Sequence, residues 1–246
     1  MYGELTSPGI VLSSMPVGEY DRRVSILTSG EGRISAFARG ARRATSQFAA
    51  STLQFTYGEF TLNARRDSYD VKSIEHVKSF SSLYSDPEAA CYGAYFCEIM
   101  EYLTRENADE AEQMKLLYMT LKALTFDNIS NRLIKCIFDI RAIANYGEGM
   151  KAEGMYYSPK ENGLVDFAAA DSRKVDTSTL HAVQYIESSA VNKLFSFSVK
   201  DEILEELEFV SNDYLKKHVD KPMKSLEILK EMQETQEILK KRSLSE

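Results

Sequence analysis

Two different periodicities of apolar residues divide the chain. In residues 9–78, short segments rich in β-branched and aromatic residues alternate apolar with polar positions and are separated by Gly, Asn and Asp, as in a small antiparallel sheet. From residue 85 onward, apolar residues recur with the 3.6-residue period of a helix. The sequence therefore predicts an α+β protein, with a small five-stranded β-barrel over residues 1–80 and a mainly α-helical domain over residues 81–246.

The third expected strand has two unlike faces. Successive side chains point to opposite sides of a strand, so every second residue shares a face. One face is apolar, and the other combines two arginines with a serine and an aromatic ring. The first set is Ile34, Ala36 and Ala38, and the second is Arg33, Ser35, Phe37 and Arg39. The five strands are expected near residues 9–15, 22–28, 33–39, 53–62 and 69–77.

The fourth expected strand contains a change of phase. Apolar residues from Leu53 to Tyr57 share one phase, whereas Phe60 and Leu62 share the other, and Gly58 lies between the two sets. A β-bulge at Gly58 would explain the change, because a bulge bends a strand and re-aims its side chains.

The second part carries helix start and stop signals. Asp86 followed by Pro87 predicts an N-terminus, because a carboxylate caps free N–H groups and proline lacks one. Ser198 and Asp201 form a second capping pair. Residues 147–175 contain four Gly and Pro159 and predict an irregular excursion between helices. The helices are expected over residues 87–105, 109–126, 129–146, 178–188, 199–217 and 223–241.

Charge is distributed unevenly along the chain. The formal net charge of -7 at pH 7 disfavours a phosphate-bearing partner. Residues 1–80 nevertheless hold 10 Lys and Arg against 8 Asp and Glu, and residues 81–246 hold 20 against 29. The acidity therefore belongs to the helical part, and the basic groups of the first part are mostly arginine.

Signatures of catalysis and of membrane insertion do not occur in the sequence. The longest apolar stretches are far shorter than the roughly 20 residues of a membrane helix, and the first residues do not resemble a secretory signal, so we expect a cytoplasmic location. HExxH, GxSxG, SxxK and phosphate-loop patterns do not occur. The three cysteines form no CxxC pair and indicate reduced core thiols. We expect neither enzymatic activity nor a cofactor.

The arginines of the first part have a clear ligand chemistry. Arg42 and Arg43 follow one strand and Arg65 and Arg66 follow another, so both pairs are expected on exposed loops. Guanidinium suits phosphate because its planar fork donates two hydrogen bonds and keeps its charge. Solvated surface charge is the alternative, and Phe37 is either a base-stacking platform or a contact beneath a loop. The candidate nucleic-acid-binding residues are Arg22, Arg23, Arg33, Phe37, Arg39, Arg42, Arg43, Arg65 and Arg66.

A series of short motifs runs along the whole chain. The first part contains Gly9-Ile10-Val11-Leu12, Glu19-Tyr20-Asp21, Gly32-Arg33 and Gly40-Ala41-Arg42-Arg43. The second part contains Phe138-Asp139-Ile140-Arg141, Tyr157-Ser158-Pro159, and Tyr214-Leu215 with His218. In their order and spacing, these motifs resemble the RecO family of bacterial recombination mediators.

The resemblance implies a function and a set of partners. It implies an oligonucleotide-binding (OB) fold for residues 1–80 that binds single- and double-stranded DNA. It further implies annealing of complementary strands and assistance in loading recombinase on single-stranded DNA during recombinational repair. The implied partners are RecR and the acidic C-terminal tail of single-strand-binding protein, in the nucleoid of a bacterial cytoplasm. A protein–protein adaptor, whose barrel docks a partner protein rather than DNA, is the alternative function.

The excursion departs from the family pattern. Many RecO proteins carry a four-cysteine zinc site there, whereas residues 147–175 contain no cysteine. Oxygen ligands do not replace a thiolate cage, so we predict that this zinc-finger-like excursion binds no metal. Packing is expected to hold it together, through Tyr156, Tyr157, Leu164 and Phe167.

Overall fold

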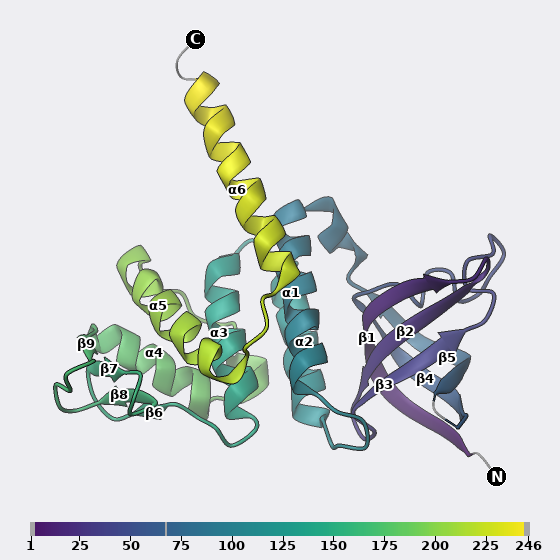
Figure 1. Ribbon diagram of the computed structural model, residues 1–246, viewed down its shortest axis with the longest axis horizontal. Coiled ribbons are helices and arrows are strands. Elements are labelled where there is room, and N and C mark those ends of the chain that lie inside the picture. Colours follow the sequence, from purple (N-terminus) through teal and green to yellow (C-terminus); the bar gives the residue numbers. More distant parts are fainter. Residues whose placement is uncertain (1–2, 67, 244–246) are drawn as a thin grey trace. The chain divides into compact units, whose positions relative to one another are not determined.

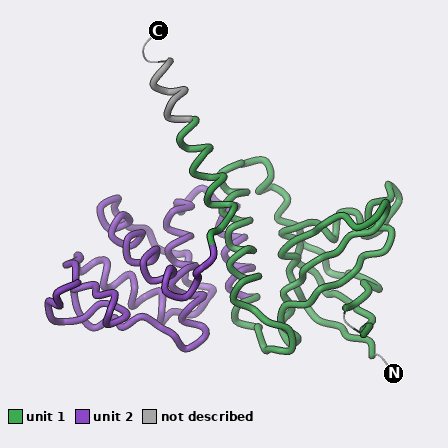
Figure 2. Tube along the Cα trace, in the orientation of Figure 1, with its two compact units in different colours: residues 1–114, 222–246 green, residues 115–221 purple. Residues whose placement is uncertain are grey.

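The computed structural model describes residues 3–66 and 68–243, with side chains described up to residue 235. A five-stranded N-terminal sheet is followed by a helical region, which confirms the α+β class (Figure 1). The chain forms two compact units, residues 1–114 with 222–246 and residues 115–221 (Figure 2). The first unit extends beyond the strands because its helices pack on the barrel and on one another.

The first unit is built around a closed barrel. Its strands follow the order β1-β2-β3-β5-β4, with β3 and β5 parallel and the other neighbours antiparallel. The apolar side chains predicted for the third strand point inward and are buried. They form the core together with residues of the other strands, including Val11, Val24, Ile26, Phe60 and Leu62. The strands are β1 (Glu4–Val17), β2 (Asp21–Thr28), β3 (Arg33–Ala38), β4 (Thr56–Ala64) and β5 (Tyr69–Ser79).

The predicted phase change in the fourth strand is wrong. β4 buries alternate residues in a single phase, and Leu53 and Phe55 precede the strand. The bulge lies opposite Gly58, in β5, where the pairing with β4 skips a residue and His76 has a φ of 50°. Gly58 allows the two strands to approach, because a Cβ there would lie 2.8 Å from Cγ2 of Ile74.

Helices complete the first unit. Asp86 caps α1 by accepting hydrogen bonds from the N–H groups of Glu88 and Ala89, with Pro87 in the first turn, as predicted. Helix α6 packs along α1 within this unit (Figure 1). The elements are η1 (Ser81–Ser85), α1 (Pro87–Leu103) and α6 (Lys224–Ser243), and α2 (Ala111–Ala123) begins in this unit and continues into the second.

The second unit is a set of helices with a small sheet. Helix α3 packs against α4 and α5. The residue that caps α5 is Lys200, which makes no side-chain capping hydrogen bond, so the predicted capping by Ser198 and Asp201 is wrong. The helices are α3 (Asn131–Ala144), α4 (Thr177–Ser188), η2 (Val191–Lys193) and α5 (Asp201–His218).

The excursion forms an ordered sheet within the second unit. Its strands are β6 (Lys151–Ala152), β7 (Tyr156–Ser158), β8 (Gly163–Val165) and β9 (Arg173–Lys174), in the order β6-β8-β7-β9. Tyr157 and Leu164 are buried, as predicted, and Tyr156 is half-buried. Phe167 is 52% exposed, so its predicted packing role is wrong. The phenol of Tyr157 donates a hydrogen bond to Asp213 of α5 over 2.8 Å, a polar contact that the sequence did not indicate.

Candidate nucleic-acid interface

The outer face of β1, β2 and β3 presents one continuous row of side chains. Met15 is paired with Arg23, and Arg23 with Phe37, so these three residues lie side by side across three strands. Arg23 donates from Nε to the hydroxyl of Ser35 over 2.8 Å. Met15 is 63% exposed, and Arg23 is exposed beside it. The row therefore places a cation between an exposed methionine and a half-buried phenylalanine.

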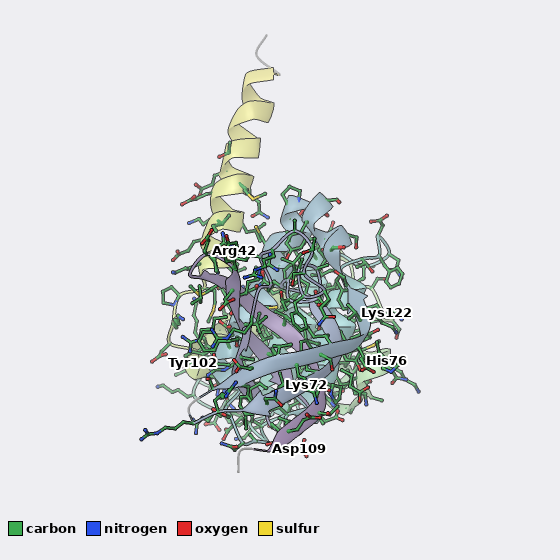
Figure 3. All side chains as sticks on the ribbon, turned by 90° about the vertical axis from the view of Figure 1, so that its right-hand side faces the viewer. Arg42, Lys72, His76, Tyr102, Asp109 and Lys122 are labelled. Atoms are coloured by element: carbon green, nitrogen blue, oxygen red, sulfur yellow. The ribbon has the colours of Figure 1, made fainter. Side chains whose placement is uncertain are left out.

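A loop after β3 is fastened to the hairpin between β1 and β2. The N–H of Arg42 donates to the carbonyl of Tyr20 over 2.8 Å, and Nη1 of Arg42 donates to the carbonyl of Gly18 over 3.0 Å. The guanidinium of Arg43 lies over the Tyr20 ring, with 4.8 Å between Cζ and the ring centroid. Both arginines are exposed, so this connection presents two cations at one end of the barrel. Figure 3 shows Arg42 there, well away from Lys72 of β5.

Arg39 connects the row to this loop. Its Nη1 donates to Oδ2 of Asp21 over 2.9 Å, and its Nε lies 3.5 Å from Oδ1 of Asp70. Its Cζ lies 5.1 Å from the centroid of the Phe37 ring, within the range of a cation–π interaction. A backbone hydrogen bond from Gly40, followed by the Arg39 guanidinium, lowers the pKa of Asp21, which therefore stays ionised beside the arginine.

The turn between β4 and β5 adds further cations. Arg65 donates from Nε to Oδ2 of Asp70 over 2.7 Å, with Nη2 2.6 Å from the same oxygen. Asp70 is aligned with Phe37 in the parallel pairing of β3 and β5, so Arg39 and Arg65 approach one carboxylate from two sides. Arg66 is exposed next to Arg65.

Two of the candidate arginines make internal contacts. Arg22 shares the inward phase of β2 and donates from Nη1 to the carbonyl of Ala49 over 2.6 Å and to the hydroxyl of Thr52 over 3.0 Å. Arg33 donates from Nε to the carbonyl of Thr104, just after α1, over 3.2 Å. Both are half-buried, and both fix a connection to the barrel.

The structure thus gathers most of the predicted residues and adds others. Arg23, Phe37, Arg39 and Arg65 are linked through shared contacts, and Arg42 and Arg43 join them through the hairpin. Sequence reasoning did not select Met15, Tyr20, Asp21 or Asp70 for this face. The outward phase of Met15 in its strand was the one available signal, since the others depend on contacts between distant segments.

Two of the three cysteines lie in the protein core. Cys97 and Cys136 are buried, and burial raises the pKa of the Cys136 thiol to about 12, which disfavours the nucleophilic thiolate. Cys91 is half-buried.

Within residues 3–66 and 68–243, no group of three or more His, Cys, Asp or Glu side chains is arranged to hold a metal ion. None of the helices in the described parts of the chain has the length and hydropathy needed to cross a membrane.

We call the exposed side chains of Arg23, Arg39, Arg42, Arg43 and Arg65 around Phe37 the arginine face. The barrel, this face and the helical region define a two-part α+β protein with a cationic surface on its sheet. Comparison with known families agrees with this division. The family described as "Recombination protein O N terminal" matches residues 1–80, and the one described as "Recombination protein O C terminal" matches residues 84–227. The chain therefore belongs to the RecO family of DNA repair proteins.

Relatives match over nearly their whole length. "DNA repair protein RecO" of Acetivibrio thermocellus is 30% identical over 92% of this chain and 96% of the relative. The proteins with the same name from Alkaliphilus metalliredigens and Dehalococcoides mccartyi are 27% and 24% identical, over 93% and 91% of this chain and 99% and 94% of their own lengths.

Proposed function

We propose that the chain is a DNA-binding recombination mediator that works without turnover. In this proposal the arginine face of the barrel binds single- and double-stranded DNA, anneals complementary strands and assists recombinase loading on single-stranded DNA. The observation that carries the proposal is the linked, exposed set of Arg23, Arg39, Arg42, Arg43 and Arg65 around Phe37. Arginine beside a half-buried aromatic ring suits a ligand that combines phosphates with stacking bases.

The barrel topology supports an OB fold for residues 1–80, with residues 81–246 as the helical domain of the proposed mediator. A five-stranded Greek-key barrel that binds oligonucleotides on its second and third strands is characteristic of that fold. Here the same two strands carry Arg23 and Phe37, the loop after β3 carries Arg42 and Arg43, and the turn between β4 and β5 carries Arg65. We propose that Arg22 and Arg33 hold this surface in place from within rather than contact DNA, while Arg66 extends it.

Replacing Arg39, Arg42 and Arg43 together by Ala tests the site. Each lost phosphate contact lowers the salt dependence of single-strand binding by about 0.7 in log–log slope, so the triple variant should lose roughly two. Affinity for a labelled oligothymidylate at low salt should fall at least about tenfold. The measurement is fluorescence anisotropy at two salt concentrations.

A matched control separates the face from overall charge. The exposed cations Lys174, Lys216 and Lys221 lie in the second unit, and their joint replacement by Ala changes net charge equally. We expect their loss to leave the slope nearly unchanged. If both triple variants lowered the salt dependence of oligothymidylate binding equally, the arginine face would not be the DNA-binding surface.

A pocket in the second unit supports the proposed contact with the acidic tail of single-strand-binding protein. The pocket has a volume of about 200 Å³ and is lined by Met119, Phe126, Ile129 and Phe195, with Lys122 among them. Phe126 is 52% exposed. Apolar walls with one ammonium group fit a peptide that carries both an apolar side chain and carboxylates.

Two single variants test the pocket. Phe126→Ala removes an apolar wall and Lys122→Glu reverses the charge, and either should weaken binding of a synthetic tail peptide while DNA binding by the barrel persists. Calorimetric titration of the full chain with the peptide measures this. Unchanged peptide affinity in both variants would place the tail elsewhere. RecR remains a proposed partner to which we assign no surface.

The adaptor alternative makes a different prediction. If the barrel docks a protein, the full chain will not bind oligothymidylate at low salt but will still capture its partner. The proposal requires binding to DNA under those conditions, since contacts to phosphate are strongest at low ionic strength.

A further inference from the structure

We propose that Asp70 is a built-in competitor of DNA phosphate that holds Arg39 and Arg65 in the free protein and thereby weakens and tunes DNA binding. The inference rests on the proposed function of the arginine face and adds a regulatory element to it. The Asp70 carboxylate is negatively charged, so it would repel DNA phosphate if no arginine were paired with it.

The Asp70 carboxylate lies against the guanidinium groups of Arg39 and Arg65, as a bound anion would. Oδ2 of Asp70 accepts from Nε of Arg65 over 2.7 Å, and Oδ1 lies 3.5 Å from Nε of Arg39. The Asp70 side chain is only 14% exposed, whereas those of Arg39 and Arg65 are 64% and 62% exposed. Two solvent-facing guanidinium groups therefore cover one carboxylate, as they would cover a phosphate oxygen pair.

Asp21 differs from Asp70 in its hydrogen-bond partners, so the effect of Asp70 on the arginines can be tested separately. Asp21 also accepts a hydrogen bond from the backbone N–H of Gly40, so its carboxylate helps to fix the loop that carries Arg42 and Arg43. The described contacts of Asp70 are made with arginine side chains. Removing the charge of Asp70 should therefore free guanidinium groups without releasing a backbone segment.

The ion pairs of Asp70 with Arg39 and Arg65 determine how strongly Asp70 competes with DNA phosphate. Such pairs are individually weak, so DNA can displace Asp70 and still bind. Two pairs released together correspond to roughly a threefold to tenfold gain in affinity for DNA. Because the effect is electrostatic and close to solvent, the gain should shrink as salt rises from about 50 to 200 mM.

Asp70→Asn tests the proposal in the full chain, with a fluorescently labelled oligothymidylate as the probe. We expect tighter binding than for the unmodified chain at low salt, with the difference reduced at high salt. Asp70→Ser serves as a second variant, and circular dichroism confirms that each is folded. In an Arg65→Ala background, the gain from Asp70→Asn should be smaller, because one of the two released arginines is gone.

A control variant removes an ion pair of the same kind elsewhere on the barrel. Glu4 of β1 pairs with Lys72 of β5 and contacts neither Arg39 nor Arg65 in the described structure. Glu4→Gln changes the net charge equally and should change the affinity less than about 1.5-fold.

The outcomes separate this inference from the function on which it rests. If the unmodified chain does not bind the oligothymidylate, both fail. If it binds and folded Asp70 variants bind equally well or more weakly, the competitor role is wrong, and weaker binding would show that Asp70 instead positions the arginines. Equal gains from Asp70→Asn and Glu4→Gln would reduce the effect to net charge and also overturn the proposal.

Discussion

The carboxylate of Asp21 accepts a hydrogen bond from the backbone N–H of Gly40, with 2.7 Å between Oδ1 and N. Gly40 has a φ of 65°, a conformation that favours glycine. The bond joins the end of the β1–β2 hairpin to the loop after β3, although the two segments are far apart in sequence. Together with the hydrogen bonds of Arg42 to Tyr20 and Gly18, it places Arg39, Arg42 and Arg43 at one end of the barrel.

This bond should make the barrel sensitive to acid. The pKa of Asp21 is below its ordinary value of 3.8, so its stabilising contribution is present above that value and is lost as pH falls through the lowered pKa. Asp21→Asn should therefore flatten part of the decline in unfolding free energy between about pH 5 and pH 2. Urea denaturation followed by circular dichroism measures it. A pH dependence identical to that of the unmodified chain would refute the role of Asp21.

A buried ion pair should be essential to the second unit. Lys135 donates from Nζ to Asp139 over 2.6 Å and to Asn212 over 2.7 Å, and Asp139 is fully buried. Lys135→Met removes the ammonium group that contacts a buried carboxylate and should destabilise the fold by about 3–5 kcal/mol.

A second substitution and a control make this prediction specific. Adding Asp139→Leu to Lys135→Met removes both charges and should recover most of the stability. The control, Lys230→Met, breaks an exposed pair with Glu234 and should cost less than about 0.5 kcal/mol. If Lys135→Met and Lys230→Met cost the same, the buried pair is not stabilising in the way described.

The local stability of the excursion should depend on the phenol hydroxyl of Tyr157. Tyr157→Phe removes the hydrogen bond to Asp213 from a buried ring, and a hydrogen bond to a charged group contributes about 1.5–3 kcal/mol. Hydrogen exchange in β7 and β8 should accelerate accordingly. Tyr185→Phe, which removes an exposed hydrogen bond to the carbonyl of Lys193, is the matched control. Unchanged exchange in β7 and β8 of the Tyr157 variant would show that packing alone holds the sheet.

The same sheet should not require a metal. Its residues offer no thiolate for a zinc cage, and the hydrogen bond from Tyr157 to Asp213 attaches the sheet to α5. Dialysis against a strong chelator should leave the thermal transition unchanged, with elemental analysis as the check. A chelator-dependent loss of the transition would mean that a bound metal contributes to the fold.

Local patterns predicted much of the fold. Alternation alone identified the buried and exposed faces of β3, and the Asp86–Pro87 pair identified the start of α1. Gly58 was misread because its meaning depends on the neighbouring strand, where the extra residue is found at His76. Periodicity along one strand contains no information about the strand beside it.

The site was less predictable than the fold. Arginine content indicated a cationic face, but Asp70 joins it through the parallel pairing of β3 with β5, which no local pattern reveals. One of the motifs that carried the family resemblance, Phe138-Asp139-Ile140-Arg141, makes structural contacts. Asp139 belongs to the buried ion pair, and Arg141 donates to the carbonyl of Ile186 at the end of α4 over 3.2 Å.

Hydrogen exchange of the full chain with and without single-stranded DNA tests the central claim most directly. The arginine face predicts slower exchange in residues 15–23, 37–43, 65–66 and 68–70 when oligothymidylate is bound, and no change in the excursion, residues 147–175. Protection confined to residues 115–221, or binding without protection of the barrel segments, would contradict the assignment of this face as the DNA-binding surface.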